Sequence, residues 1–470
     1  MSPLAARRRY ALISALTWLP TALGVAPMVL LMQVRGMGLT EVGLVFAVYS
    51  IAVAALELPT GGFADVIGRR TVLAASAAVG IAALAWMAFA TSLWMFLAVS
   101  VLKAIARALS SGPAEAWYVD TARTAGADER ELRRGLSQGS AAGSATLAVG
   151  TLAGGGLPLL TSWLVTLPDD GVLVPLSVPM LVGAAASVVL LVVALAVLTE
   201  PPRAARVRMT DVLRDVPVTI GKGIRLGVRD GVLTRVLLTA VVLGIALNAI
   251  ELLTPGRLAD LTGDADTASS AYALVAAIGF AASAGGASIG PRVASMFSRF
   301  APERAPAWTV VSGAIVAALS LGGLAASADL DGGPGIVAAA AAYTGMFTGL
   351  GIANPLRSEL LHSRVAPTER ATVLSIDSLM LQTGGTVGAV ALGAVAAQWS
   401  VGAAWWIAAA VTLTAATLHL SPPLRPKGSP AILKLGSAET GTQASRSRVG
   451  PDHPVGAGVD VHSGGAEEAD

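Results

Sequence analysis

Hydrophobic residues occur along this chain in twelve runs of about twenty residues, separated by short polar breaks. A helix of about twenty apolar residues is long enough to cross the ~30 Å hydrocarbon core of a bilayer. The pattern therefore predicts twelve membrane-spanning helices. We place them at residues 10–34, 41–62, 71–91, 93–119, 135–160, 173–198, 235–256, 268–290, 307–327, 335–358, 371–397 and 402–420.

The composition favours the same fold class, an all-α integral membrane protein. Of the 470 residues, 54% are hydrophobic and 13% are charged, with a mean hydropathy of +0.69, beyond what water-soluble domains show. The 52 glycines, mixed with many alanines and leucines, suit helices that pack closely in lipid. The net charge of +2 gives no reason to expect a nucleic-acid partner.

The polar breaks alternate in charge, and this alternation predicts the orientation of the helices. Positive residues of short loops are retained on the cytoplasmic side. Breaks after even-numbered helices are rich in arginine, whereas breaks after odd-numbered helices contain Arg35, Arg257 and several aspartates. We therefore expect a multi-pass protein of the cell (inner) membrane with both termini in the cytoplasm.

The longest internal break divides the helices into two sets of six. The sequence predicts an N-terminal bundle at 1–199, a cytoplasmic linker at 200–234, a C-terminal bundle at 235–420 and a disordered cytoplasmic tail at 421–470. The middle of the linker alternates apolar and basic residues, which fits an amphipathic helix on the membrane surface or a solvated connection.

The most specific motif lies between the second and third runs. It reads Gly61-Gly62-Phe63-Ala64-Asp65-Val66-Ile67-Gly68-Arg69-Arg70. This resembles the G-x-x-x-D-x-x-G-R-R signature of the major facilitator superfamily, with Val66 at a position that is usually basic. The resemblance extends over residues 10–420. It implies two pseudo-symmetric six-helix bundles, a mid-membrane site between them and transport by alternating access.

The motif also implies a conformational latch. We expect Gly61 and Gly68 to permit a tight turn there, and Asp65 to pair with neighbouring charges. The resemblance implies that Asp377, at the start of the eleventh helix, packs against this loop; a simple helix-dipole role for Asp377 is the alternative. The predicted latch residues are Gly61, Asp65, Gly68, Arg69, Arg70, Asp120 and Asp377.

The fourth run contains charges that are expensive inside a membrane and therefore indicate function. Lys103, Arg107, Ser111 and Glu115 recur at four-residue spacing, which predicts one polar stripe along a helix. Arg107 resembles the fourth-helix arginine that the superfamily often uses in proton coupling. A structural buried ion pair is the alternative for Arg107.

Three further carboxylates and an amide are candidates for proton coupling or for the substrate cavity. Glu57 and Glu115 share a predicted depth, so they are candidates for a proton-carrying cluster. The alternative is that Glu115 and Asp120 neutralise Arg69 and Arg70. Asn248 and Glu251 lie on one face of the seventh helix, where Glu251 either binds a proton or cation or reaches the outer surface.

The fifth run is rich in glycine. Gly150, Gly154 and Gly155 have the spacing that lets helices approach closely, which is sufficient to explain them. They also resemble the G-x-x-x-G-P-x-x-G-G motif of antiporters in the superfamily, with Gly155 in place of the proline. This resemblance implies antiport.

Together these features predict proton-coupled efflux of a hydrophobic or drug-like small molecule. An importer or facilitator of a small metabolite, and a non-transporting membrane protein, are the alternatives. We expect a monomer whose partners are substrate, protons and lipid. We expect no cofactor, metal or enzymatic activity, since phosphate-binding and zinc-protease motifs are missing, cysteine is absent and the four histidines do not cluster.

Overall fold

Each predicted apolar run forms a helix in the computed structural model, which describes residues 1–167, 171–199, 209–366 and 369–419. Within these ranges the chain contains helices and no strand. The α-helices are α1 Pro3–Val25, α2 Pro27–Val34, α3 Leu39–Ile67, α4 Arg69–Phe89, α5 Leu93–Ser110, α6 Pro113–Thr124, α7 Glu129–Leu164, α8 Val178–Val197, α9 Met209–Arg229, α10 Gly231–Thr262, α11 Ala265–Ser298, α12 Ala305–Ala326, α13 Gly332–Ser363, α14 Arg370–Gln398 and α15 Val401–Thr417.

Eleven helical segments of the described chain are long and apolar enough to cross a membrane, and α15 is a shorter apolar helix. The predicted fold class is therefore confirmed. Two of the twelve predicted runs are interrupted. The first is divided between α1 and α2 just before Pro27, and the fourth is divided between α5 and α6 at Gly112. Gly112 has a φ of 97°, which a residue with a side chain rarely adopts.

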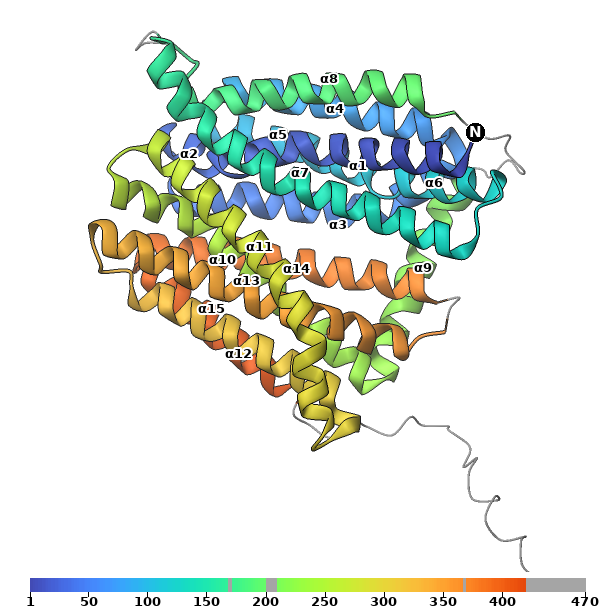
Figure 1. Cartoon of the computed structure of the whole chain (residues 1–470). Helices are drawn as coiled ribbons and strands as arrows, with labels where there is room; N and C mark the ends of the chain where they lie inside the picture. The colour runs from blue at the N-terminus through green and yellow to red at the C-terminus, as the bar shows by residue number, and fades with distance from the viewer. Residues whose placement is uncertain (168–170, 200–208, 367–368, 420–470) are drawn as a thin grey trace, which may run out of the picture. The chain divides into compact units, whose positions relative to one another are not determined.

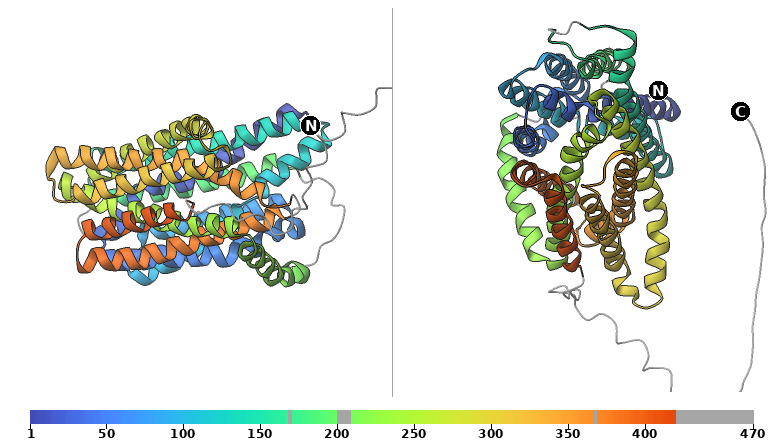
Figure 2. Two further views of the ribbon diagram at one scale, coloured as in Figure 1. Left: turned by 90° about the horizontal axis from the view of Figure 1, so that it is seen from below. Right: turned by 90° about the vertical axis from the view of Figure 1, so that its left-hand side faces the viewer.

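The helices form two groups, as Figures 1 and 2 show, with α1 to α8 in one group and α10 to α15 in the other. We call these groups the N-bundle and the C-bundle. We call the ends near the N-terminus and the arginine-rich breaks the basic side, and the opposite ends the acidic side. The linker forms α9, which packs against α3, α10 and α14 on the basic side.

The buried apolar residues show that the two bundles share a core on the acidic side. One continuous core combines the acidic-side halves of both bundles, for example Leu30 and Phe96 with Leu253 and Tyr343. On the basic side there are two separate cores. One surrounds Trp117 in the N-bundle, and the other surrounds residues 233–237 in the C-bundle.

Close contacts between small residues hold the bundles together at the acidic side. Ser270 of α11 donates a hydrogen bond to the backbone oxygen of Gly155 in α7, with an O–O distance of 3.0 Å. A Cβ atom at Gly155 would lie 2.6 Å from the Ser269 backbone oxygen, so only glycine permits this approach. Figure 1 shows α7 and α11 close together at this end and diverging towards the basic side.

Helices α3 and α14 contact each other along most of their length. Near the acidic side, a Cβ at Gly393 would lie 2.9 Å from the Leu39 backbone oxygen. Towards the basic side, the Ser378 hydroxyl donates a 2.6 Å hydrogen bond to a Glu57 carboxylate oxygen. This pair of helices therefore continues the contact between the bundles from the shared core towards the basic side.

The linker and tail predictions have different outcomes. The helix α9 contains the amphipathic stretch, with Gly223 against Ile376 of α14 while Ile224 and Val228 are exposed. Its exposed apolar side chains fit a membrane-surface position, which remains a prediction. The predicted disordered tail at 421–470 lies outside the described residues.

The contact at Gly155 makes a specific prediction about the closed acidic side. We expect Gly155→Val to separate the bundles there, because the added side chain collides with α11. Gly156→Val is a matched control, since a Cβ at Gly156 meets nothing within 4 Å and both substitutions place the same residue in α7.

The chain has no cysteine, so spin labels at Thr40→Cys and Asp331→Cys report the distance across the acidic side without further substitutions. Gly155→Val should lengthen this distance and Gly156→Val should leave it unchanged. Equal distance distributions in the two variants would contradict the role of Gly155.

Candidate functional site at the bundle interface

Two cations lie on α5 within the membrane-spanning part of the N-bundle, and each faces an aromatic ring. The Lys103 ammonium lies 6.0 Å from the centre of the Tyr49 ring in α3. The Arg107 guanidinium lies 5.2 Å from the centre of the Trp18 ring in α1. Both distances are typical of cation–π contacts. The Lys103 Nζ also lies 2.9 Å from the Met28 sulfur.

Neither cation is neutralised by a neighbouring carboxylate. Among the described residues, no acidic side chain lies within 4 Å of Lys103 or Arg107. The structural alternative for Arg107, a buried ion pair, is therefore not found in this conformation. A membrane-embedded cation without a partner requires a polar or water-accessible surrounding.

Glu251 of α10 provides a negative charge from the C-bundle. Its side chain is exposed, whereas Ile250, Leu252, Leu253 and Thr254 on either side are all at most 1% exposed. Asn248 and Thr254, three positions away on the same face of α10, are also buried, at 6% and 0% exposed, whereas residues of a lipid-facing stripe share their exposure at this spacing. The isolated exposure therefore indicates that Glu251 faces an accessible space inside the protein.

Tyrosines connect Glu251 with the two cations. Tyr49 lies close enough to Arg107, Glu57 and Glu251 to interact with their charges. On the C-bundle, Tyr272 and Tyr343 interact with the charge of Glu251, and their rings pack edge to face at 6.0 Å. We define the central cluster as Trp18, Tyr49, Lys103, Arg107, Glu251, Tyr272 and Tyr343.

The remaining cavity candidates lie apart from one another. The predicted stripe of four polar residues is wrong, because the break at Gly112 places Glu115 on α6, where its side chain is exposed. Glu57 bonds to Ser378 and is not grouped with Glu115 among the described contacts. Asn248 is buried against Gly388 of α14, and its Oδ1 has no hydrogen-bond donor among the described residues.

The latch motif is more helical than the sequence suggested. Helix α3 continues through Gly61 to Ile67, so the expected turn at Gly61 is wrong. Only Gly68, with a φ of 110°, separates α3 from α4. The side chain of Asp65 lies outside the described set.

Arg69 forms an ion pair with Asp120 of α6 and donates a 2.7 Å hydrogen bond to the Ala116 backbone oxygen. The side chain of Arg70 is exposed. Arg69 therefore ties α4 to α6 within the N-bundle. A latch function of these residues remains a proposal.

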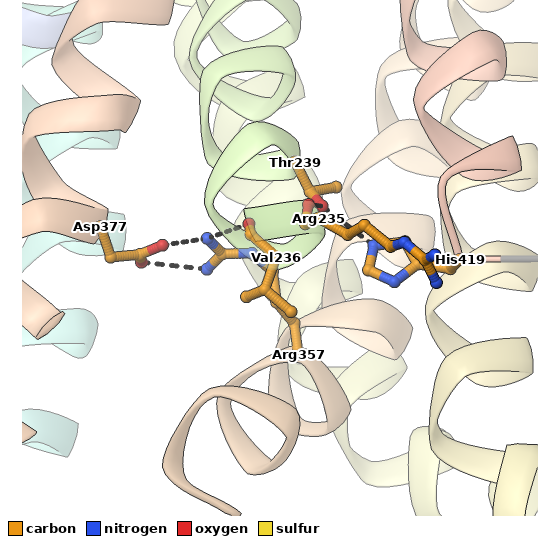
Figure 3. Close-up of polar contacts among 6 residues, drawn as sticks. All are labelled: Arg235, Val236, Thr239, Arg357, Asp377 and His419. Carbon is orange, nitrogen blue, oxygen red and sulfur yellow. Dashed lines mark hydrogen bonds and ion pairs between the residues drawn. The ribbon is translucent and has the colours of Figure 1, made fainter. Parts of the chain in front are cut away.

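Asp377 belongs to a second charged contact on the basic side, which Figure 3 shows. Both of its carboxylate oxygens accept hydrogen bonds from Arg357 of α13, and Arg357 also donates to the Val236 backbone oxygen of α10 at 3.2 Å. Nearby, the Thr239 hydroxyl lies 2.9 Å from His419 Nε2. In this conformation Asp377 therefore pairs with an arginine of its own bundle, and its packing against the latch motif remains a proposal.

The fifth-helix glycines separate into two kinds. Gly150 and Gly154 lie against Ala22 and Leu23 of α1, as close packing within the N-bundle requires. Gly155 faces the C-bundle, as described above. The geometry explains all three glycines by helix packing, and antiport remains a proposal.

The Arg357–Asp377 pair makes a testable prediction about stability. Arg357 is 8% exposed, so Asp377→Asn leaves a buried guanidinium without its counter-charge. We expect a loss of about 3–5 kcal/mol, with much of it recovered in the double variant Arg357→Met/Asp377→Leu. Thermal unfolding in lipid-detergent mixtures and a double-mutant cycle measure this.

The matched control is Asp230→Asn, which weakens the more exposed Arg364–Asp230 pair at 3.7 Å and keeps a residue that can cap α10. We expect a loss of about 0–1 kcal/mol there. Equal losses in Asp377→Asn and Asp230→Asn would contradict the importance of burial.

Comparisons with known proteins place this architecture in a family. The chain resembles solved structures of the nucleoside transporter NupG (16% identity, TM-score 0.68, covering 88% of this chain and 98% of that one). It also resembles a bacterial homologue of the human lysosomal transporter Spinster in an inward-facing, unoccupied conformation (16% identity, TM-score 0.66, covering 91% and 99%). No curated protein matches its sequence. The family model of the Major Facilitator Superfamily matches residues 10–354, and the chain belongs to this superfamily.

Proposed function

We propose that the chain is a proton-coupled secondary transporter of a small organic molecule, with Glu251 as the proton site and the central cluster as the substrate site. It lies in the cell (inner) membrane with its basic side towards the cytoplasm. This orientation rests on the charge alternation of the loops. The conformation described above is then closed towards the outside.

The observation that supports coupling is the position of Glu251. It is an ionisable side chain inside a membrane span, it faces an accessible space, and it has no ion-pair partner among the described residues. Such residues commonly form proton pathways in transporters. Tyr49, Tyr272 and Tyr343 from three other helices interact with its charge. The cations of Lys103 and Arg107 lie on the other side of this group, where both are close to Tyr49.

Besides a proton site, transport requires that the substrate site opens to each side of the membrane in turn. The acidic-side closure consists of small-residue contacts, such as Gly155 with Ser270 and Gln33 with Gly256. Such contacts involve few hydrogen bonds, so separation of the bundles there breaks few of them. Proton and substrate binding then shift the population between the two states.

Two directions of transport are proposed. Efflux in exchange for protons is favoured by the resemblance of the glycine-rich α7 to the antiporter motif. Uptake together with protons is favoured by the two unpaired cations, because an anion bound near them increases the affinity of Glu251 for a proton. The similarity to a nucleoside transporter is compatible with uptake of a polar metabolite.

The sequence suggested a mainly apolar, drug-like substrate because few fixed charges were visible in the presumed cavity. The central cluster changes this proposal. Its aromatic rings suit an apolar body, and its cations suit a charged group. A purely neutral hydrophobic substrate would leave both cations unneutralised.

Glu251→Gln tests the proposed coupling. In proteoliposomes, we expect compounds that wild-type protein transports to drive proton movement, reported by a pH-sensitive dye, and we expect Glu251→Gln to abolish it. Exchange of labelled for unlabelled compound across the membrane should persist, since exchange needs no change in protonation.

The control is Glu115→Gln, an exposed carboxylate on α6 that should behave as wild type. Inverted and right-side-out vesicles under an imposed pH gradient distinguish efflux from uptake. Retention of proton movement in Glu251→Gln would refute the assignment of the proton site.

A further inference from the structure

We infer that the substrate carries an anionic group, such as a carboxylate or phosphate, that binds between Lys103 and Arg107, with an apolar body against Trp18 and Tyr49. This inference rests on the proposed function, since it takes the central cluster to be the transport site. It adds the chemical class of the substrate, which the fold does not specify.

The first argument is charge balance. Lys103 and Arg107 place two positive charges within a membrane-spanning segment, where unpaired charges are costly. The N-bundle offers neither of them an acidic partner within 4 Å among the described residues. A substrate anion would supply the missing counter-charge during transport.

The second argument is geometry. Residues four apart on a helix have Cβ atoms about 5–6 Å apart on the same face, so both cations can reach one oxyanion. The ammonium provides a compact charge with three donors, and the guanidinium provides a planar fork that matches carboxylate or phosphate oxygens. In the described structure, neither side chain donates a hydrogen bond to an oxygen acceptor.

The third argument concerns the surroundings of the two cations. Trp18 and Tyr49 cover them from α1 and α3, and Trp18 is itself held against Gly143 of α7. These rings limit the motion of the cations and provide flat apolar surfaces next to the charges. An organic anion with an aromatic or apolar body matches this pattern better than a small inorganic anion.

Binding of matched probes to the purified full chain in lipid nanodiscs tests the inference. The probes are phenylacetate, phenylacetamide and phenethylamine, which share one ring and differ in charge, together with phenyl phosphate for the alternative anionic group. Calorimetric titration without any proton gradient measures affinity. We expect at least one of the two anions to bind at least about tenfold more tightly than the amide and the amine.

Substitutions of Lys103 and Arg107 test whether the preference for anionic probes arises at these two cations. Lys103→Gln and Arg107→Gln should each weaken binding of the anion by about tenfold or more. Lys103→Arg and Arg107→Lys keep the charge and should retain most of the affinity, which separates loss of charge from loss of folding. Arg299→Gln, at the exposed end of α11, is the matched control and should bind as wild type.

The outcomes separate this inference from the proposed function. If Glu251→Gln still binds the anion and still couples transport to protons, the anion site is supported and only the assignment of the proton site is refuted. The anion site is overturned if the amide or amine binds as tightly as both anions, if neither anion binds, or if the two glutamine variants bind like wild type.

Discussion

The shared apolar core on the acidic side is the constraint on which the rest of the structure depends. It joins the two bundles over one half of the membrane and leaves each bundle with its own core over the other half. On the basic side, the described residues form no apolar core that includes both bundles. Glu251 lies at the surface of this core, because Ile250, Leu252 and Leu253 next to it along α10 are buried in the core while its own side chain is exposed. Tyr272 and Tyr343 of the central cluster belong to the core itself.

Movement of the bundles requires that each is more stable than the contact between them. Within the bundles, charged contacts tie neighbouring helices together, with Arg69 joining α4 to α6 and Arg357 joining α13 to α10 and α14. The contact of Arg357 is costly to break, because this guanidinium is buried and would remain as an uncompensated charge. Between the bundles, glycine contacts such as that of Gly155 rely on close packing and few hydrogen bonds. The expected result is two rigid bodies with a reversible interface, as rocking requires.

Sequence periodicity predicted the twelve helices because each must span the same thickness of lipid, whatever its neighbours are. It did not predict the break at Gly112, since one glycine inside an apolar run is compatible with a continuous helix. The cost of intramembrane charge identified Arg107 and Glu251, and the same argument applied to the tenth run would have identified Arg357. Tyr49 and Tyr272 could not be found in this way. An aromatic residue in an apolar run has the same pattern whether it packs in the core or faces a charge across the bundle interface.

The division of charges between the bundles provides a physical basis for the proposed proton coupling. Lys103 and Arg107 belong to the N-bundle, whereas Glu251 belongs to the C-bundle. Rocking must therefore change the distance between cations and carboxylate, while distances within each bundle stay fixed. Coulomb energy falls inversely with distance. For any two unit charges, doubling an illustrative separation of about 6 Å removes about 1.4 kcal/mol at an effective dielectric constant of about 20. A change of about 1.4 kcal/mol alters a binding equilibrium about tenfold. Placing the two charges on different rigid bodies therefore makes proton affinity depend on conformation, without any further moving part.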